Sequence, residues 1–554
     1  MKKFMLCLVA GTLIPLSAAA QFSHNGIRYG IIDYNSKTCC TLKPNSPASS
    51  YWLKGSHTVP AIVKDVAHDD DYTVITIGES TFTMCSGLTS VSLPGTLRHI
   101  DNYAFSGCSN LSGITLPDGL LSIGDQSFIN CGITAVRIPD SVTEVGLGAF
   151  SSCKSMETLI LSNSLTKISA HCYASCHTLS QVALPPSVTS IGDNAFSYCQ
   201  SLRCVEIHGP VTTIGKLAFQ KCHALQGISL PESVRSLGME TFKECSSLKD
   251  IRLSSALTSI EEATFDKCSA LESIKLPAGV QSLGLNAFRD CSSLREVEFS
   301  EGLTNIGSQA FYNCNSLQTL TLPNTLTSIG TYAFYKNTSL SEVTFGNNLK
   351  SIENNAFSTC IGLKRVNIAD IESWCSVEIK DAGANPLYYA GHIFCGGQEI
   401  TDLEIPEGVK RINDNTFCFA KGLTTITLPS SVEFIGHGTF MNCDNVTTII
   451  SRSDIVPEIS SYTFHGIWDK AELQVPASMI DLYKAHPLWR KFRIRPIEES
   501  GLKSVVVDES STSDKKADVY NIQGICILHG ATQQEIDALP AGLYIINNEK
   551  IVKQ

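Results

Sequence analysis

The chain has 554 residues, a formal net charge of −11 and only 17% charged side chains. An acidic chain of this kind argues against nucleic acid as a partner and against electrostatic attachment to a membrane. No apolar run of about 18 residues follows the N-terminus, so we expect no transmembrane segment.

The first 20 residues have the pattern of a signal peptide. An apolar run begins at Phe4 behind two lysines, and small residues at Ala18 and Ala20 fit the rule for cleavage. We therefore predict an exported protein. Residues 21–75 contain short apolar stretches, which predict strands and hairpins that form an N-terminal cap.

Most of the remaining chain, residues 76–470, repeats one unit of 23 residues, which we call a rung. The marker of the register is Phe-x-x-Cys. The cysteines in this slot are Cys85, Cys108, Cys131, Cys153, Cys176, Cys199, Cys222, Cys245, Cys268, Cys291, Cys314, Cys360 and Cys443. A fixed period of this length predicts a β-rich solenoid in which each repeat adds one layer.

The rung Leu271–Cys291 shows what each position does. Ile274 and its alternating neighbours predict a strand with apolar side chains inward and Lys275 outward. Gly284 suits a turn that requires a positive φ. Phe288 is expected to pack on the equivalent phenylalanine of the next rung, so that the stack is the unit of stability.

The cysteine column admits two interpretations, namely disulfides or metal sites, and small buried side chains. Stacked residues have parallel Cβ vectors, which is poor disulfide geometry, and free cysteine is among the most buried residue types. We therefore predict buried free thiols, although Asn337 occupies one slot. Cys39 and Cys40 lie outside the column, and their pairing stays open.

One cluster has the spacing of a zinc site: His171, Cys172, Cys176 and His177. Both cysteines fall on core positions of the repeat, so we expect no metal and no cofactor. The chain also lacks the short motifs of serine hydrolases, zinc proteases and P-loop enzymes. We therefore predict that it is not an enzyme.

The period breaks between Phe357 and Phe417, where an insertion at about 370–402 predicts a variant rung with a hairpin. The insertion is rich in aromatic residues, and its candidate binding aromatics are Trp374, Tyr388, Tyr389 and Phe394.

The C-terminal region changes character again. Residues 471–497, with a short helix expected between Met479 and Leu488, predict a C-terminal cap. Residues 498–517 read as a linker with one strand at 505–507, and residues 518–554 as a small β module.

The repeated Ala-Phe-x-x-Cys, Leu-x-x-Ile-x-Leu-Pro and Val-x-x-Ile-Gly patterns resemble the BspA-like leucine-rich repeat of bacterial surface proteins over roughly 76–470. The resemblance implies a right-handed superhelix on the cell surface, adhesion for some members, and no catalytic residues. The tail, through Tyr520-Asn521-x-Gln523-Gly524 and Gly542-Leu543-Tyr544, resembles the sorting domain of type IX cargo of Bacteroidetes. That resemblance implies export by this machinery, to the outer surface of a Gram-negative cell or into the medium.

Outward positions on the Leu-x-x-Ile-x-Leu strand become charged in the middle rungs. We name these residues the charged strip: Arg203, Glu206, Lys249, Asp250, Arg252, Glu272, Lys275, Arg295, Glu296 and Glu298. The strip is either a solvated sheet face or a docking surface.

Two functions follow from these surfaces. The first is a non-enzymatic surface protein that binds or adheres to an extracellular macromolecule through a broad polar strip. The alternative is a carbohydrate-binding or structural envelope protein, which predicts an exposed aromatic platform near Trp374. The partner is accordingly an extracellular protein or a glycan.

Overall fold

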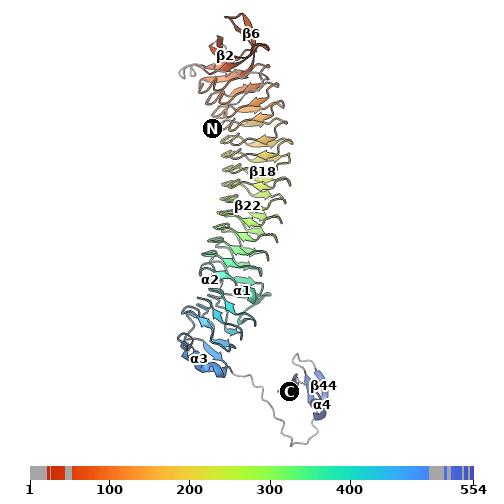
Figure 1. Cartoon of the computed structure of the whole chain (residues 1–554), viewed down its shortest axis with the longest axis vertical. Coiled ribbons are helices and arrows are strands. Elements are labelled where there is room, and N and C mark those ends of the chain that lie inside the picture. The colour runs from red at the N-terminus through yellow and green to blue at the C-terminus, as the bar shows by residue number, and fades with distance from the viewer. Residues whose placement is uncertain are drawn as a thin grey trace.

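The computed structural model describes residues 21–24, 26–43, 53–497, 517–520, 526–539, 542–546 and 549–553. The signal peptide and the strand expected at 505–507 lie outside the described residues. Residues 53–497 form a long, gently curved rod of stacked rungs (Figure 1). The predicted solenoid is therefore confirmed.

Each regular rung begins with a strand of three to five residues, and these strands form the long-strand face of the rod. They are β7 (Leu88–Ser92), β9 (Gly113–Thr115), β11 (Ala135–Arg137), β13 (Thr158–Ile160), β15 (Gln181–Leu184), β17 (Cys204–Ile207), β19 (Gly227–Ser229), β21 (Asp250–Arg252), β23 (Ser273–Lys275), β25 (Glu296–Glu298), β27 (Thr319–Thr321), β29 (Glu342–Thr344), β31 (Arg365–Ile368), β35 (Asp402–Glu404), β37 (Thr425–Leu428), β39 (Thr448–Ser451) and β41 (Glu472–Val475).

A second strand of two residues follows in each rung, and these strands form the short-strand face. They are β8 (His99–Ile100), β10 (Ser122–Ile123), β12 (Glu144–Val145), β14 (Lys167–Ile168), β16 (Ser190–Ile191), β18 (Thr213–Ile214), β20 (Ser236–Leu237), β22 (Ser259–Ile260), β24 (Ser282–Leu283), β26 (Asn305–Ile306), β28 (Ser328–Ile329), β30 (Ser351–Ile352), β32 (Glu378–Ile379), β36 (Arg411–Ile412), β38 (Phe434–Ile435) and β40 (Glu458–Ile459). Strands pair in parallel with the same strand of the next rung, as Ile274 does with Val297.

The core forms as the alternation predicts. Ile274 is buried, whereas Lys275 is exposed. Phe288 stacks on the equivalent rings of both neighbouring rungs, with ring centroids 5.2 Å apart on each side. Stacked rings therefore hold successive rungs in register along the rod.

The prediction that Gly284 supplies a positive φ is wrong. In its rung the positive φ values belong to Asn286 (58°) and Asp290 (57°). Glycine is needed at position 284 because an added Cβ would lie 2.6 Å from the backbone nitrogen of Glu262, in the preceding rung. The requirement is close approach between rungs, not backbone conformation.

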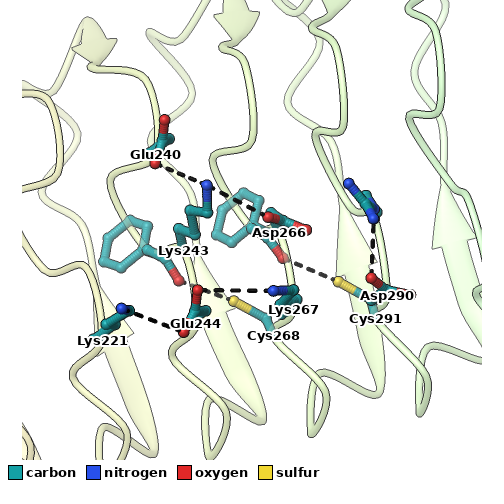
Figure 2. A network of polar contacts seen from close by, with 12 residues as sticks. Lys221, Glu240, Lys243, Glu244, Asp266, Lys267, Cys268, Asp290 and Cys291 are labelled. Atoms are coloured by element: carbon teal, nitrogen blue, oxygen red, sulfur yellow. Dashed lines mark hydrogen bonds and ion pairs between the residues drawn. The ribbon is translucent and has the colours of Figure 1, made fainter.

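The cysteine column is buried, and from Cys108 onward it consists of free thiols, as predicted. The column thiols from Cys108 onward act as hydrogen-bond donors. The Sγ of Cys268 donates to the carbonyl of Phe242, and that of Cys291 to the carbonyl of Phe265, both at 3.2 Å (Figure 2). In the exceptional rung, Asn337 donates through Nδ2 to the equivalent carbonyl at 2.9 Å. The slot therefore favours a small buried side chain, which is a hydrogen-bond donor in most rungs, although Ala420 fills it in the rung of Phe417.

The described residues between 21 and 77 form strands and hairpins, as expected. The strands are β1 (Gln21–His24), β2 (Ile27–Asp33), β3 (Thr38–Leu42), β4 (Gly55–Thr58), β5 (Ile62–Asp65) and β6 (Asp70–Ile77). β6 pairs with β8 and β4 with β7, so these strands continue both faces beyond the first rung. Their role as a cap stays a prediction. Cys39 and Cys40 are both buried, and Cys39 is a free thiol.

The insertion contains the expected hairpin and two short helices that the sequence did not predict. Its elements are α1 (Ile371–Cys375), α2 (Leu387–Ala390), β33 (Ile393–Cys395) and β34 (Gln398–Glu399). β33 and β34 pair antiparallel. Asp370 caps α1 by accepting a hydrogen bond from the amide of Ser373 at 2.7 Å.

After β41 the rod ends in short helices and one last parallel strand. These elements are η3 (Ala477–Met479), α3 (Ile480–Ala485), η4 (Trp489–Lys491) and β42 (Arg493–Pro496). The buried Trp489 donates through Nε1 to the carbonyl of Pro457 at 2.8 Å. The expected helix is therefore present, and the role of this region as a cap stays a prediction.

The described part of the tail forms a separate small antiparallel sheet, in the order β44-β43-β45-β46. Its elements are β43 (Ala517–Tyr520), β44 (Cys526–Ala531), α4 (Gln533–Asp537), β45 (Gly542–Ile546) and β46 (Glu549–Lys553). The helix α4 was not predicted from the sequence.

Candidate functional site

All ten residues of the charged strip are exposed on the long-strand face. Part of their charge is neutralised there. The Nζ of Lys275 lies 2.5 Å from a carboxylate oxygen of Glu298, its register partner on the next strand. Arg252 pairs at 2.9 Å with Glu232, a carboxyl whose pKa is lowered chiefly by the hydrogen bond from the Ser255 amide. These two cations therefore belong to surface ion pairs.

Three other cations of the strip behave differently. Arg203, Lys249 and Arg295 form no ion pair with any acidic side chain in the described parts of the chain. They occupy one column in alternate rungs, because each is the exposed residue immediately before its strand: β17, β21 and β25 respectively. The strip therefore offers unneutralised donors on a flat face, which is what an acidic or polar partner surface requires.

The insertion does not bring its four candidate aromatics to the surface together. Trp374 is only 2% exposed and donates through Nε1 to the carbonyl of Thr416 at 2.8 Å. The guanidinium of Arg365 covers the ring of Phe394 at 3.7 Å. The exposed aromatic platform that the carbohydrate alternative predicts therefore does not include Trp374, because α1 turns this side chain into the core.

The other two aromatics lie nearer to solvent. Tyr389 is half-buried and accepts a hydrogen bond from the amide of Thr359 at 2.9 Å. Tyr388 is 43% exposed, and its ring centroid lies 4.6 Å from that of Phe419. Sequence reasoning missed Phe419, although its position two residues after Phe417 is unusual for an aromatic. An aromatic pair, Tyr388 and Phe419, is what remains of the predicted platform.

A second polar feature, which sequence reasoning also missed, runs along the edge that carries the phenylalanine marker. Two positions after the marker, Glu244 lies between two lysines: its carboxylate is 3.9 Å from Lys221 and 3.8 Å from Lys267 (Figure 2). We call these three residues the charge ladder. The alternation of sign at 23-residue spacing was the signal available in the sequence.

One position closer to the marker, Lys243 pairs with Glu240 at 2.9 Å and with Asp266 at 3.7 Å. Asp266 is almost fully buried, and burial raises the pKa of its carboxyl. These charges neutralise one another across rungs. They therefore connect neighbouring layers and leave little free charge for a ligand.

The histidine and cysteine cluster is divided between core and surface. Cys172 and Cys176 are buried, and the Sγ of Cys176 donates to the carbonyl of Phe150 at 3.4 Å. His171 is exposed. Within the described ranges, no three side chains of the metal-binding types come together. None of the helices in those ranges has the length and apolar character needed to cross a membrane.

Comparison with known proteins gives consistent results for the repeat. The sequence matches the BspA type leucine rich repeat region, in six copies, over residues 75–203, 199–291, 258–376 and 390–485. A comparison with curated proteins finds no match.

Two solved structures resemble the rod. A leucine-rich repeat protein from Bacteroides ovatus ATCC 8483 is 28% identical, with 65% of this chain and 99% of that chain covered and a TM-score of 0.52. A leucine rich cell surface protein from Faecalibacterium prausnitzii A2-165 is 25% identical, with 65% and 98% covered and a TM-score of 0.40.

Proposed function

Because the chain belongs to the BspA-type leucine-rich repeat family, we propose that it is a non-enzymatic binding protein displayed at the cell surface. It holds an extracellular protein on its long-strand face. The signal-peptide pattern and the tail supply export by the type IX route in this proposal. A relative that is described as a cell surface protein supports the same location.

The observation that carries the proposal is the column formed by Arg203, Lys249 and Arg295. Each cation is exposed, and none is engaged by a described acidic side chain. Arginine is enriched at the energetic centres of protein interfaces. The strip holds five basic and five acidic residues, so it suits a protein surface of mixed charge better than a uniform polyanion.

A binding screen tests the proposal. The purified chain from residue 21 onward is applied to arrays of extracellular matrix and host surface proteins at two salt concentrations. Hits should weaken as salt rises, because the contact is largely electrostatic. Reversal of all three cations to glutamate should abolish them.

The matched control reverses three exposed cations outside the strip, Lys154, Arg235 and Lys350, and so changes the net charge equally. This variant should keep the hits. Equal loss of binding in both variants would show that the effect depends only on net charge, and it would contradict a binding site on the strip.

The pair formed by the exposed Tyr388 and the half-buried Phe419 favours a second candidate, carbohydrate binding at the insertion. Aromatic rings present an apolar face with polar edges, which suits a sugar surface. This candidate would be favoured over the first if the protein arrays gave no hits and if glycan-array hits disappeared in Tyr388→Ala.

A further inference from the structure

The short-strand face is hollowed by an open groove with a volume of about 900 Å³ that none of the surfaces above includes. It runs along the rod across successive rungs, from Asp125 at one end to Glu261 at the other. Its floor is a column of small residues, one per rung: Gly146, Ser169, Gly192, Gly215 and Gly238.

The groove exists because of how the rungs stack. A Cβ added to Gly192 would lie 2.6 Å from the backbone nitrogen of Ala170 in the preceding rung, and one added to Gly238 2.3 Å from that of Lys216. Tight stacking therefore excludes most side chains from this column. The residues on either side keep theirs, and the result is a trench that is one residue wide.

The two walls differ in chemistry. The strand wall carries Glu144, Lys167, Ser190, Thr213 and Ser236. The opposite wall carries Leu147, Ala170, Asp193, Lys216 and Met239. Hydroxyl groups therefore recur along one side, while the exposed side chains of Leu147 (44%) and Met239 (41%) offer apolar contacts near both ends.

The charge of the lining excludes a polyanion. Four carboxylates face two ammonium groups, a formal excess of two negative charges. Three of the carboxylates are used within the fold: Asp125 accepts from the Leu147 amide at 2.7 Å, Asp193 from the Lys216 amide at 2.8 Å, and Glu261 from the Ser259 hydroxyl at 2.5 Å. Neither Lys167 nor Lys216 pairs with an acid anywhere in the described ranges, so both remain available as donors.

The spacing of the lining discriminates between polymers. Equivalent wall residues recur once per rung, at roughly 4.8 Å. An extended polypeptide advances about 3.3–3.6 Å per residue, and it therefore falls out of step with the rungs. An extended chain of β-linked pyranoses advances by close to one rung per sugar, and it presents hydroxyls and C–H faces that match the two walls.

We propose that this groove binds a linear, uncharged, β-linked glycan laid along the rod, with one sugar per rung. Small apolar faces of the sugars rest on Leu147, Ala170 and Met239. Their hydroxyls meet Ser190, Thr213 and the two free lysines. The site is distinct from the charged strip and from the Tyr388 pair, because all of its lining residues belong to the edge and strands of the short-strand face.

The test is calorimetric titration of the whole chain from residue 21 with cellohexaose and β-1,4-mannohexaose. At least one of the two should bind, and its affinity should rise with chain length up to about five sugars, the number of floor positions, and then level off. Maltohexaose, which is α-linked and curved, and hexagalacturonate, which is acidic, should bind at least tenfold more weakly.

Two variants locate the site. Ser190→Trp with Thr213→Trp fills the trench and should weaken binding at least tenfold. The matched control, Ser328→Trp with Ser351→Trp, places the same side chains on equivalent strand positions outside the groove and should leave affinity unchanged. Lys167→Ala with Lys216→Ala removes donors without adding bulk and should weaken binding severalfold, and thermal melting confirms that each variant is folded.

Several results would overturn the proposal. They are the absence of binding by both neutral hexaoses, tighter binding of hexagalacturonate, and equal affinity of the filled and control variants. Loss of binding in Tyr388→Ala, with the filled variant unaffected, would place glycan binding at the insertion instead. Failure of the protein array leaves this test unaffected, since it uses a different face and a different ligand.

Discussion

The cysteine column makes a quantitative prediction about its donor role. In Cys291→Ala the carbonyl of Phe265 loses the thiol donor at 3.2 Å but keeps the amide of Cys268 at 3.0 Å. The full penalty of an unpaired buried carbonyl is therefore avoided. One lost hydrogen bond contributes about 1 kcal/mol, and removal of the buried sulfur about 1 kcal/mol more. We expect a loss of about 2 kcal/mol in the free energy of unfolding.

One natural exception in the column, Asn337, supplies the opposite change. Asn337 donates to two carbonyls, but its Oδ1 is buried without a partner. Asn337→Cys keeps the donor and removes the unsatisfied acceptor, so it should stabilise the chain by about 1 kcal/mol, whereas Asn337→Ala should destabilise it.

Urea unfolding gives the overall change in free energy, and amide hydrogen exchange shows whether it is confined to the altered rung, as expected for a stack of layers. The reasoning would be refuted if Cys291→Ala stayed within about 0.5 kcal/mol of the parent, or if Asn337→Cys and Asn337→Ala were equally destabilising.

Three further changes test other features. Burial and the neighbouring Glu79 raise the pKa of Asp101 to about 6, so ionisation of this carboxyl destabilises the folded chain at higher pH. Asp101→Asn should therefore increase the free energy of unfolding by up to about 3 kcal/mol at pH 8 and have no such effect at pH 4. Unfolding measured at both pH values checks this. Glu244→Gln should cost less than about 1 kcal/mol, and the cost should shrink in high salt, since the charge ladder is only partly buried; a larger, salt-independent cost in a melting series would contradict this. Gly284→Ala should cost about 1–3 kcal/mol by overpacking, whereas Gly95→Ala, with no atom within 4 Å of its added Cβ, should be neutral; equal melting temperatures would show that close approach is not the constraint.

The features that could be predicted from the sequence are those fixed by the pattern of a single rung or by its regular repetition. The inward direction of Ile274 follows from alternation along its own strand, and the stacking of Phe288 follows from the period. The role of Gly284 could not be found this way, because it depends on the backbone of the preceding rung. The positive φ of Asn286 and Asp290 carries no glycine signal, since ordinary side chains fill both slots.

The candidate surfaces differ in the same way: those that depend on local sequence could be predicted, and those that depend on contacts between distant residues could not. Exposure of the charged strip followed from strand register, which is local. The burial of Trp374 depends on α1, which the sequence pattern did not reveal, and the pairing of Tyr388 with Phe419 joins residues that lie on either side of the hairpin β33–β34. The groove was missed because its walls are built from single residues contributed by successive rungs, none of which is distinctive alone.

The hydrogen bond that the column thiols from Cys108 onward make to the preceding rung also has a chemical consequence. Thiolate, not thiol, attacks disulfides and oxidants. Burial raises the pKa of Cys245 to about 12, so at neutral pH this sulfur holds its proton, and the layers around it block access. A rung that docks on its predecessor therefore withdraws its own sulfur from disulfide exchange. In an oxidising compartment, assembly of the stack protects the whole column from incorrect cross-linking, and Cys204 is left as the exposed thiol of the described rod.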